Sequence, residues 1–184
     1  MSAEKIFVIT REDNLVSLDV WQACYGLHIH PLQIGKYFIA DEPKFAQDLR
    51  DYGKLYVAAP LIRVMDKVRE RWGRPLHVNS FNRSDAKQAA LRASGARAAT
   101  TSPHCVFLAM DVDTTSAADT RKLAKIILQA AKDLGIKVRI GYDDYLKDGN
   151  TFVHVDVCPE YYAEGKPRYS TLHPTVWEMP YLIW

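Results

Sequence analysis

The chain has 184 residues, of which 48% are hydrophobic, and this is enough apolar material for one globular domain with a substantial core. The formal net charge is +2 and no run of Lys or Arg exceeds two residues, so a dedicated nucleic-acid surface is not indicated, although a mildly basic protein can still favour a polyanionic substrate. The three cysteines, Cys24, Cys105 and Cys158, are too widely spaced for a disulfide framework or a cysteine-rich zinc site.

The N-terminal residues lack the continuous apolar run of a signal peptide, and no apolar run in the chain approaches the roughly 20 residues that cross a bilayer. We therefore expect a protein that is made in the cytoplasm, does not insert into membranes, and needs another agent to deliver it if it acts outside.

The first 50 residues give weak signals. Short strands are predicted at 7–9 and 37–40, and a helix at 43–50. His28 and His30 alternate around one residue, but without a third ligand we interpret them as surface or partly buried polar groups.

From residue 59 the pattern sharpens. Apolar residues at helical spacing predict a helix over 60–72, ended by Gly73. A short strand over 76–80 follows, and Ser84 is placed to cap a helix that reaches about Ser94.

A histidine and a carboxylate then stand seven positions apart, with a nearly apolar run between them. The run predicts a buried strand, with His104 in its approach and Asp111 on it. Asp113 shares a face with Asp111, but it precedes a capping-box pattern at 114–119 and is expected to help start the next helix.

The C-terminal third predicts a helix ended by Gly135, a strand over 137–142 and a polar turn over 143–150. A strictly alternating strand over 151–157 then carries His154. Two imidazoles and one carboxylate brought in on strands satisfy the needs of a three-ligand zinc site with an open fourth position. Asp156 shares a face with His154 and is a candidate for orienting that ligand.

Three ordered motifs carry a resemblance to a known family. Ser80-Phe81-Asn82-Arg83 resembles an S-x-x-R motif, the stretch from Ser102 to Asp111 resembles S-x-H-x-x-G-x-A-x-D, and the strand around His154 resembles a closing H-V-D strand. Together they resemble the zinc D-Ala-D-Ala carboxypeptidase and L-alanyl-D-glutamate endopeptidase family, a peptidase M15-like family that shares its fold with the hedgehog signalling domain. The resemblance covers about residues 55–158.

The resemblance implies an α+β fold with a small antiparallel sheet and flanking helices. We expect one domain over 1–184, with a metallopeptidase core at about 55–158 where the resemblance lies, an N-terminal extension at 1–50 and an aromatic tail at 160–184 that packs on the core. The resemblance also implies Zn²⁺ held by His104, Asp111 and His154.

The implied function is a hydrolase that cuts stem peptides of bacterial peptidoglycan, as an endolysin or another cell-wall-degrading enzyme of phage origin would after delivery or lysis. Arg83 is implied to bind the substrate carbonyl or carboxylate and to stabilise the oxyanion, and Ser102 to contact the peptide backbone.

Two positions depart from the family pattern. Phe107 stands where the family usually has Gly, and we expect it to reshape the space behind the ligands. Thr151 stands where many members carry a catalytic acid, three residues before the last histidine. Asp148, six residues before His154, stands where hedgehog-type domains carry a carboxylate, so the general base is assigned first to Asp148, with three further candidates, Asp156, Asp143 and Asp144.

The alternative is a hedgehog-like zinc domain that binds a peptide or protein partner without chemistry. The sequence does not indicate which peptide bond would be cut or the oligomeric state.

Overall fold

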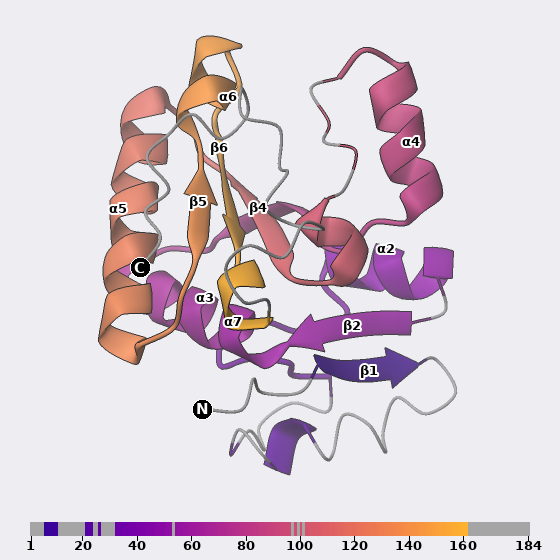
Figure 1. Cartoon of the computed structure of the whole chain (residues 1–184). Helices are drawn as coiled ribbons and strands as arrows, with labels where there is room; N and C mark the ends of the chain where they lie inside the picture. The colour runs from indigo at the N-terminus through magenta and orange to yellow at the C-terminus, as the bar shows by residue number, and fades with distance from the viewer. Residues whose placement is uncertain are drawn as a thin grey trace.

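The computed structural model describes residues 6–10, 21–23, 26, 32–52, 54–96, 98, 100 and 102–161. It is an α+β fold in which helices flank a four-stranded antiparallel sheet of order β3-β4-β6-β5, with a separate two-stranded sheet β1-β2 (Figure 1). The predicted fold class is therefore confirmed. The predictions for His28, His30 and the tail beyond Tyr161 lie outside the described residues.

The elements follow one another in the order β1 (Ile6–Thr10), α2 (Pro43–Tyr52), β2 (Lys54–Ala58), α3 (Ala59–Trp72), β3 (His77–Ser80), α4 (Asp85–Ala93), the 3₁₀ turn η1 (Pro103–Val106), β4 (Ala109–Asp113), α5 (Ala117–Leu134), β5 (Arg139–Gly141), α6 (Asp143–Lys147), β6 (Phe152–Asp156) and α7 (Cys158–Tyr161). In the part of the chain that is described, no helix is both long and apolar enough to cross a membrane.

The four-stranded sheet has one apolar face and one face that carries polar side chains. Successive residues of a strand point to opposite faces, so Val112 of β4 and Val153 of β6 share one face while Asp111 and His154 share the other. Both valines are fully buried in the hydrophobic core. The alternation that the sequence shows in β6 thus separates the core from the candidate site.

Helices α3 and α5 pack against each other, and α5 also lies along β5 and β6 (Figure 1). The predicted stop and start signals hold: Gly73 and Gly135 end these helices in the left-handed conformation, and Ser116 caps α5 by accepting a hydrogen bond from the Asp119 amide. The fully buried Leu123 and Ile127 lie on the inner face of α5 and contribute to the core.

The predicted strand at 37–40 is wrong, because only an isolated bridge between Gln33 and Ile39 forms there. The amides of Lys36 and Tyr37 donate to the Asp66 carboxylate at 2.8 and 3.0 Å, so they are not available to a neighbouring strand. A half-buried residue of α3 has taken the place of a strand partner.

Three other local predictions are corrected. The predicted turn at 143–150 contains the short helix α6, whose acidic first turn suits the helix dipole. The strand predicted for the apolar run between His104 and Asp111 starts only at Ala109, because η1 extends to Val106, while His104 lies in the approach as predicted. Asp113 does not start α5, since its carboxylate lies 3.2 Å from the His77 ring nitrogen and Ser116 provides the cap.

Candidate metal centre and active site

The register of the sheet places the candidate residues in one row. Ser80 of β3 pairs with Asp111 of β4, Asp111 pairs with His154 of β6, and His154 pairs with Gly141 of β5. A register shift between Val78 and Ser80 brings Ser80 opposite Asp111. Antiparallel neighbours on one face lie within reach of each other, so pairing alone brings Asp111 to His154.

His104 reaches the same point from η1. The Ser102 hydroxyl caps this turn by accepting a hydrogen bond from the His104 amide, and Pro103 begins it. The turn ends at Phe107, whose φ of 67° is the left-handed conformation, and the Phe107 amide donates to the His104 carbonyl. A tight turn closed in this way directs the His104 side chain back across the start of β4.

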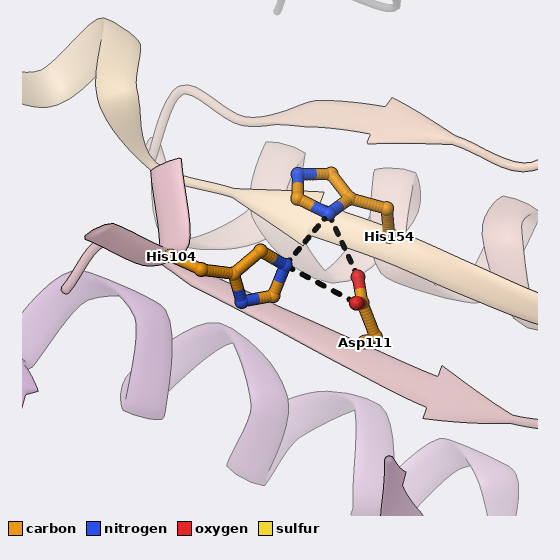
Figure 2. Close-up of side chains that lie close together, drawn as sticks. All are labelled: His104, Asp111 and His154. Atoms are coloured by element: carbon orange, nitrogen blue, oxygen red, sulfur yellow. Dashed lines mark hydrogen bonds and ion pairs between the residues drawn. The ribbon is translucent and has the colours of Figure 1, made fainter. Parts of the chain in front are cut away.

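The three side chains point toward one another from η1, β4 and β6 (Figure 2). One potential ligand atom from each of His104, Asp111 and His154 lies within 4.8 Å of the others, and all three residues are buried. His104 Nε2 lies 3.2 Å from Asp111 Oδ2, and His154 Nδ1 lies 2.8 Å from Asp111 Oδ1. The two ring nitrogens are 3.3 Å apart.

The other nitrogen of each ring is held by an acceptor. His104 Nδ1 lies 2.5 Å from the Phe81 carbonyl oxygen, and His154 Nε2 lies 3.2 Å from Asp156 Oδ2. A carbonyl oxygen can only accept, so the His104 proton is on Nδ1 and the Nε2 lone pair faces the centre. Asp156 does the same for His154, as the sequence suggested, and is itself paired with Arg139 at 2.9 Å.

This donor set fits a divalent cation. When the outer nitrogens of His104 and His154 donate, each neutral ring directs the lone pair of its other nitrogen toward the Asp111 carboxylate. Acceptors that face one another in this way repel unless a proton or a cation lies between them. Burial lowers the pKa of His104, which favours the neutral ring that a metal requires. Burial opposes ionisation of Asp111, but the neighbouring His104 and His154 hold the pKa of its carboxyl well below its usual range.

His154 behaves differently from His104. Burial alone would lower the pKa of its ring, but hydrogen bonds with Asp111 and Asp156 outweigh burial and raise it. Two carboxylates on either side of one imidazole are the arrangement that stabilises positive charge at that place. Two imidazoles and a carboxylate are also the ligand types found in catalytic zinc sites with an open position.

Arg83 lies beside the three side chains. Its guanidinium donates to Gln88 Oε1 at 2.7 Å and to Ser80 Oγ at 2.8 Å, and one of its nitrogens is 3.7 Å from Asp111 Oδ2. Two fixed partners limit the rotation of the guanidinium, so its positive charge is held next to the carboxylate.

The candidates for a general base occupy different surroundings. Asp148 is exposed at the C-terminal end of α6. Asp144 is buried, and its Oδ1 accepts from Lys147 at 2.8 Å. Asp156 is committed to Arg139 and His154, and the Thr151 hydroxyl donates to the Thr114 carbonyl at 3.0 Å.

Asp143 is half-buried in the first turn of α6 and lies 3.6 Å from the Lys147 ammonium group. Ser102 is buried and serves as the cap of η1, which is the loop role its place before proline allowed. Its predicted contact with a peptide substrate stays a prediction.

Sequence reasoning missed the polar support behind Arg83 and His104. The buried carboxylate of Asp48 accepts from the Asn82 amide at 3.0 Å, and the Asn82 side chain donates to the Tyr56 carbonyl at 2.9 Å. Gln88, which holds Arg83, was also missed. The only local signal for Gln88 was its place four residues after a predicted N-cap, and Asp48 gave none.

The chain is similar to a solved structure and to a family model. The crystal structure of Serratia marcescens L-Ala D-Glu endopeptidase ChiX is similar with a TM-score of 0.48 and 25% sequence identity, over 65% of this chain and 90% of that one. No curated protein matches the chain. The Peptidase M15 family model matches residues 40–156, a span that holds all of the candidate site residues described above. The chain is a member of the Peptidase M15 family.

Proposed function

We propose that the protein is a zinc-dependent peptidase that hydrolyses peptide bonds in the stem peptides of bacterial peptidoglycan. One observation carries the proposal: His104, Asp111 and His154 of a Peptidase M15 chain bring one ligand atom each within 4.8 Å of the others. The substrate class is supported by the three ordered motifs, which resemble the peptidoglycan-cleaving peptidases of this family.

The ligand types favour zinc among the divalent cations. Imidazole and carboxylate together suit zinc, whereas magnesium and calcium prefer sites made of oxygen atoms. A zinc ion bound by these residues would supply Lewis acidity for the carbonyl and lower the pKa of a water molecule. Phe81 and Asp156 would keep the two imidazoles in the tautomers that leave a lone pair for the metal.

Arg83 would stabilise the negative charge that develops on the carbonyl oxygen of the scissile bond. Its guanidinium is already fixed by Ser80 and Gln88, so little reorganisation is needed when the charge appears. Removing one such donor typically lowers kcat by about 10²- to 10³-fold. Asp148 is our first assignment for the group that takes a proton from the attacking water, because it is the most exposed of the four candidate acids.

The proposal is tested by metal content and product analysis of one set of variants. Purified wild-type protein should contain stoichiometric zinc by elemental analysis and should release new termini from purified muropeptides, identified by mass spectrometry. His104→Ala should lose both properties because it removes one of the buried ligands. The masses of the products distinguish cleavage after L-Ala from release of a terminal D-Ala.

His77→Ala is the matched control for this experiment. His77 is an exposed histidine of the same sheet, paired with Asp113 and outside the three-residue site, so its loss should change neither zinc content nor hydrolysis. Wild-type protein that takes up no zinc at all would reject the proposal.

The second candidate is a zinc domain that binds a peptide or protein without cutting it. Thr151 favours it, because the hydroxyl that stands in place of an acid is engaged with the Thr114 carbonyl. Protein that binds zinc and muropeptides but yields no new termini after prolonged incubation would support this candidate. Action on the cell wall after delivery or lysis, and a phage origin, remain part of the proposal.

A further inference from the structure

A buried carboxylate lies behind the candidate site, on a helix that the sequence motifs did not include. Asp48 of α2 is only 6% exposed, and its Oδ2 accepts a hydrogen bond from the Asn82 backbone amide at 3.0 Å. Burying a carboxylate away from water costs free energy unless hydrogen bonds or opposite charges compensate, so the burial of Asp48 needs an explanation.

The backbone that Asp48 holds is the backbone that supports the site. The Phe81 carbonyl oxygen lies 2.5 Å from His104 Nδ1, and the Arg83 amide donates to the His104 carbonyl at 3.1 Å. The Arg83 guanidinium lies beside Asp111 at 3.7 Å. Residues 81–83 therefore contact both the ring and the main chain of His104, and they place the positive charge next to Asp111.

This segment follows the end of β3 and belongs to no helix or strand. Its anchors come from elsewhere: Phe81 packs edge-on against Phe45 of α2 with ring centroids 4.8 Å apart, and the Asn82 side chain donates to Tyr56 of β2. Asp48 adds the anchor on the central amide. Two residues of α2 thus hold the segment, one by apolar packing and one by a charge-assisted hydrogen bond.

We propose that Asp48 is a positioning residue, which fixes the backbone of residues 81–83 so that Phe81 orients His104 and Arg83 faces Asp111. The inference rests on the proposed function in one respect, since it assumes that the His104 site binds zinc. Its test uses zinc affinity, which does not depend on catalysis.

Zinc affinity is measured by competition with a chromophoric chelator at 25 °C, on variants whose folded state is checked by circular dichroism. Asp48→Ala removes the acceptor and should weaken zinc binding by about 10- to 100-fold, as the loss of groups that orient metal ligands typically does. Asp48→Asn keeps an oxygen acceptor in the same place and should bind zinc with an affinity close to that of wild type.

Asp51→Ala is the matched control, because Asp51 is an exposed acid near the end of the same helix and should leave zinc affinity unchanged. If Asp48→Ala does not fold, Asp48→Ser replaces it, since its hydroxyl is too short to meet the Asn82 amide and should weaken zinc binding in the same way. A folded Asp48→Ala or Asp48→Ser protein with wild-type zinc affinity overturns the inference. Wild-type protein that binds no zinc instead overturns the proposed function.

Discussion

At the scale of single residues, the proposed reaction needs a carboxylate that accepts a proton from water. The candidate acids differ in exposure. The Asp144 side chain is buried and bonded to Lys147, and Asp156 is held by Arg139. Asp148 is exposed at the C-terminal end of α6, where solvent reaches its carboxylate. Exposure thus favours the acid that family resemblance favoured.

Asp148→Asn should therefore lower kcat by about 10²- to 10⁴-fold while zinc content stays at the wild-type level, because only a proton acceptor is removed. Steady-state kinetics on a purified muropeptide and elemental analysis measure the two quantities.

Asp51→Asn is the control for this prediction, since Asp51 is an exposed acid of α2 that is not among the candidates for the base. Equal rates for wild type and Asp148→Asn would move the assignment to Asp144, and Asp144→Asn would then be expected to lose activity.

At the scale of elements, the turn η1 explains why the family position occupied by Phe107 is usually glycine. Phe107 has a φ of 67° and closes the turn that presents His104. Glycine adopts this conformation at no steric cost, whereas other residues lose about 1–2 kcal/mol. The Phe107 ring compensates by stacking on Tyr56, with ring centroids 3.7 Å apart and an angle of 9° between the planes.

Replacing Phe107 separates these two effects. Phe107→Ala keeps the unfavourable backbone conformation and loses the stack, so it should lower the free energy of unfolding by about 1–3 kcal/mol. Phe107→Gly loses the same stack but relieves the backbone, and should be more stable than the alanine variant by about 1 kcal/mol. Urea denaturation of the three proteins measures the order.

A glycine variant that is no more stable than the alanine variant would show that the left-handed conformation at position 107 carries no cost. Both Phe107 variants should bind as much zinc as wild type, since residue 107 bonds to the His104 carbonyl through its backbone amide, which both variants retain.

At the scale of the whole molecule, the buried acid on α2 makes stability depend on pH. Burial raises the pKa of the Asp48 carboxyl from 3.8 to about 6, against the opposing effects of the Asn82 amide and of the nearby Lys44 and Lys87. Asp51 lies near it and acts in the same direction as burial. The folded protein therefore binds the Asp48 proton more tightly than the unfolded chain does.

The sign of the effect follows from proton uptake. Between pH 4 and pH 6 the folded state holds the Asp48 proton and the unfolded state has released it. The free energy of unfolding therefore falls as pH rises through this range. Above pH 6 both states have released the proton, and Asp48 adds no further pH dependence. The contribution of Asp48 should amount to about 1–3 kcal/mol between pH 4 and pH 6.

Asp48→Asn should remove this part of the pH dependence and should be more stable than wild type at pH 7, as measured by urea denaturation at several pH values. If the free energies of unfolding of wild type and Asp48→Asn changed equally between pH 4 and pH 6, this prediction would be contradicted. A group that destabilises the protein at neutral pH but supports the site is consistent with the trade between stability and function in enzymes.

Much of the fold and of the candidate site was readable from the sequence. Helical spacing and end signals gave α3 and α5, because Gly73, Ser116 and Gly135 act through local backbone geometry. Strict alternation gave β6 and the face on which His154 lies. The predictions failed where groups distant in sequence decide the structure, as at residues 37–40, where the Tyr37 amide donates to the Asp66 carboxylate.

The sequence by itself determined the residue types of the site and their order along the chain, because motif spacing and strand periodicity are local properties. Only the tertiary structure decided which atoms face the centre, since the tautomers of His104 and His154 depend on Phe81 and Asp156. It also decided that α2 supports the site. The Asp48 carboxylate meets the Asn82 amide across 34 positions of sequence, and no local pattern encodes such a contact.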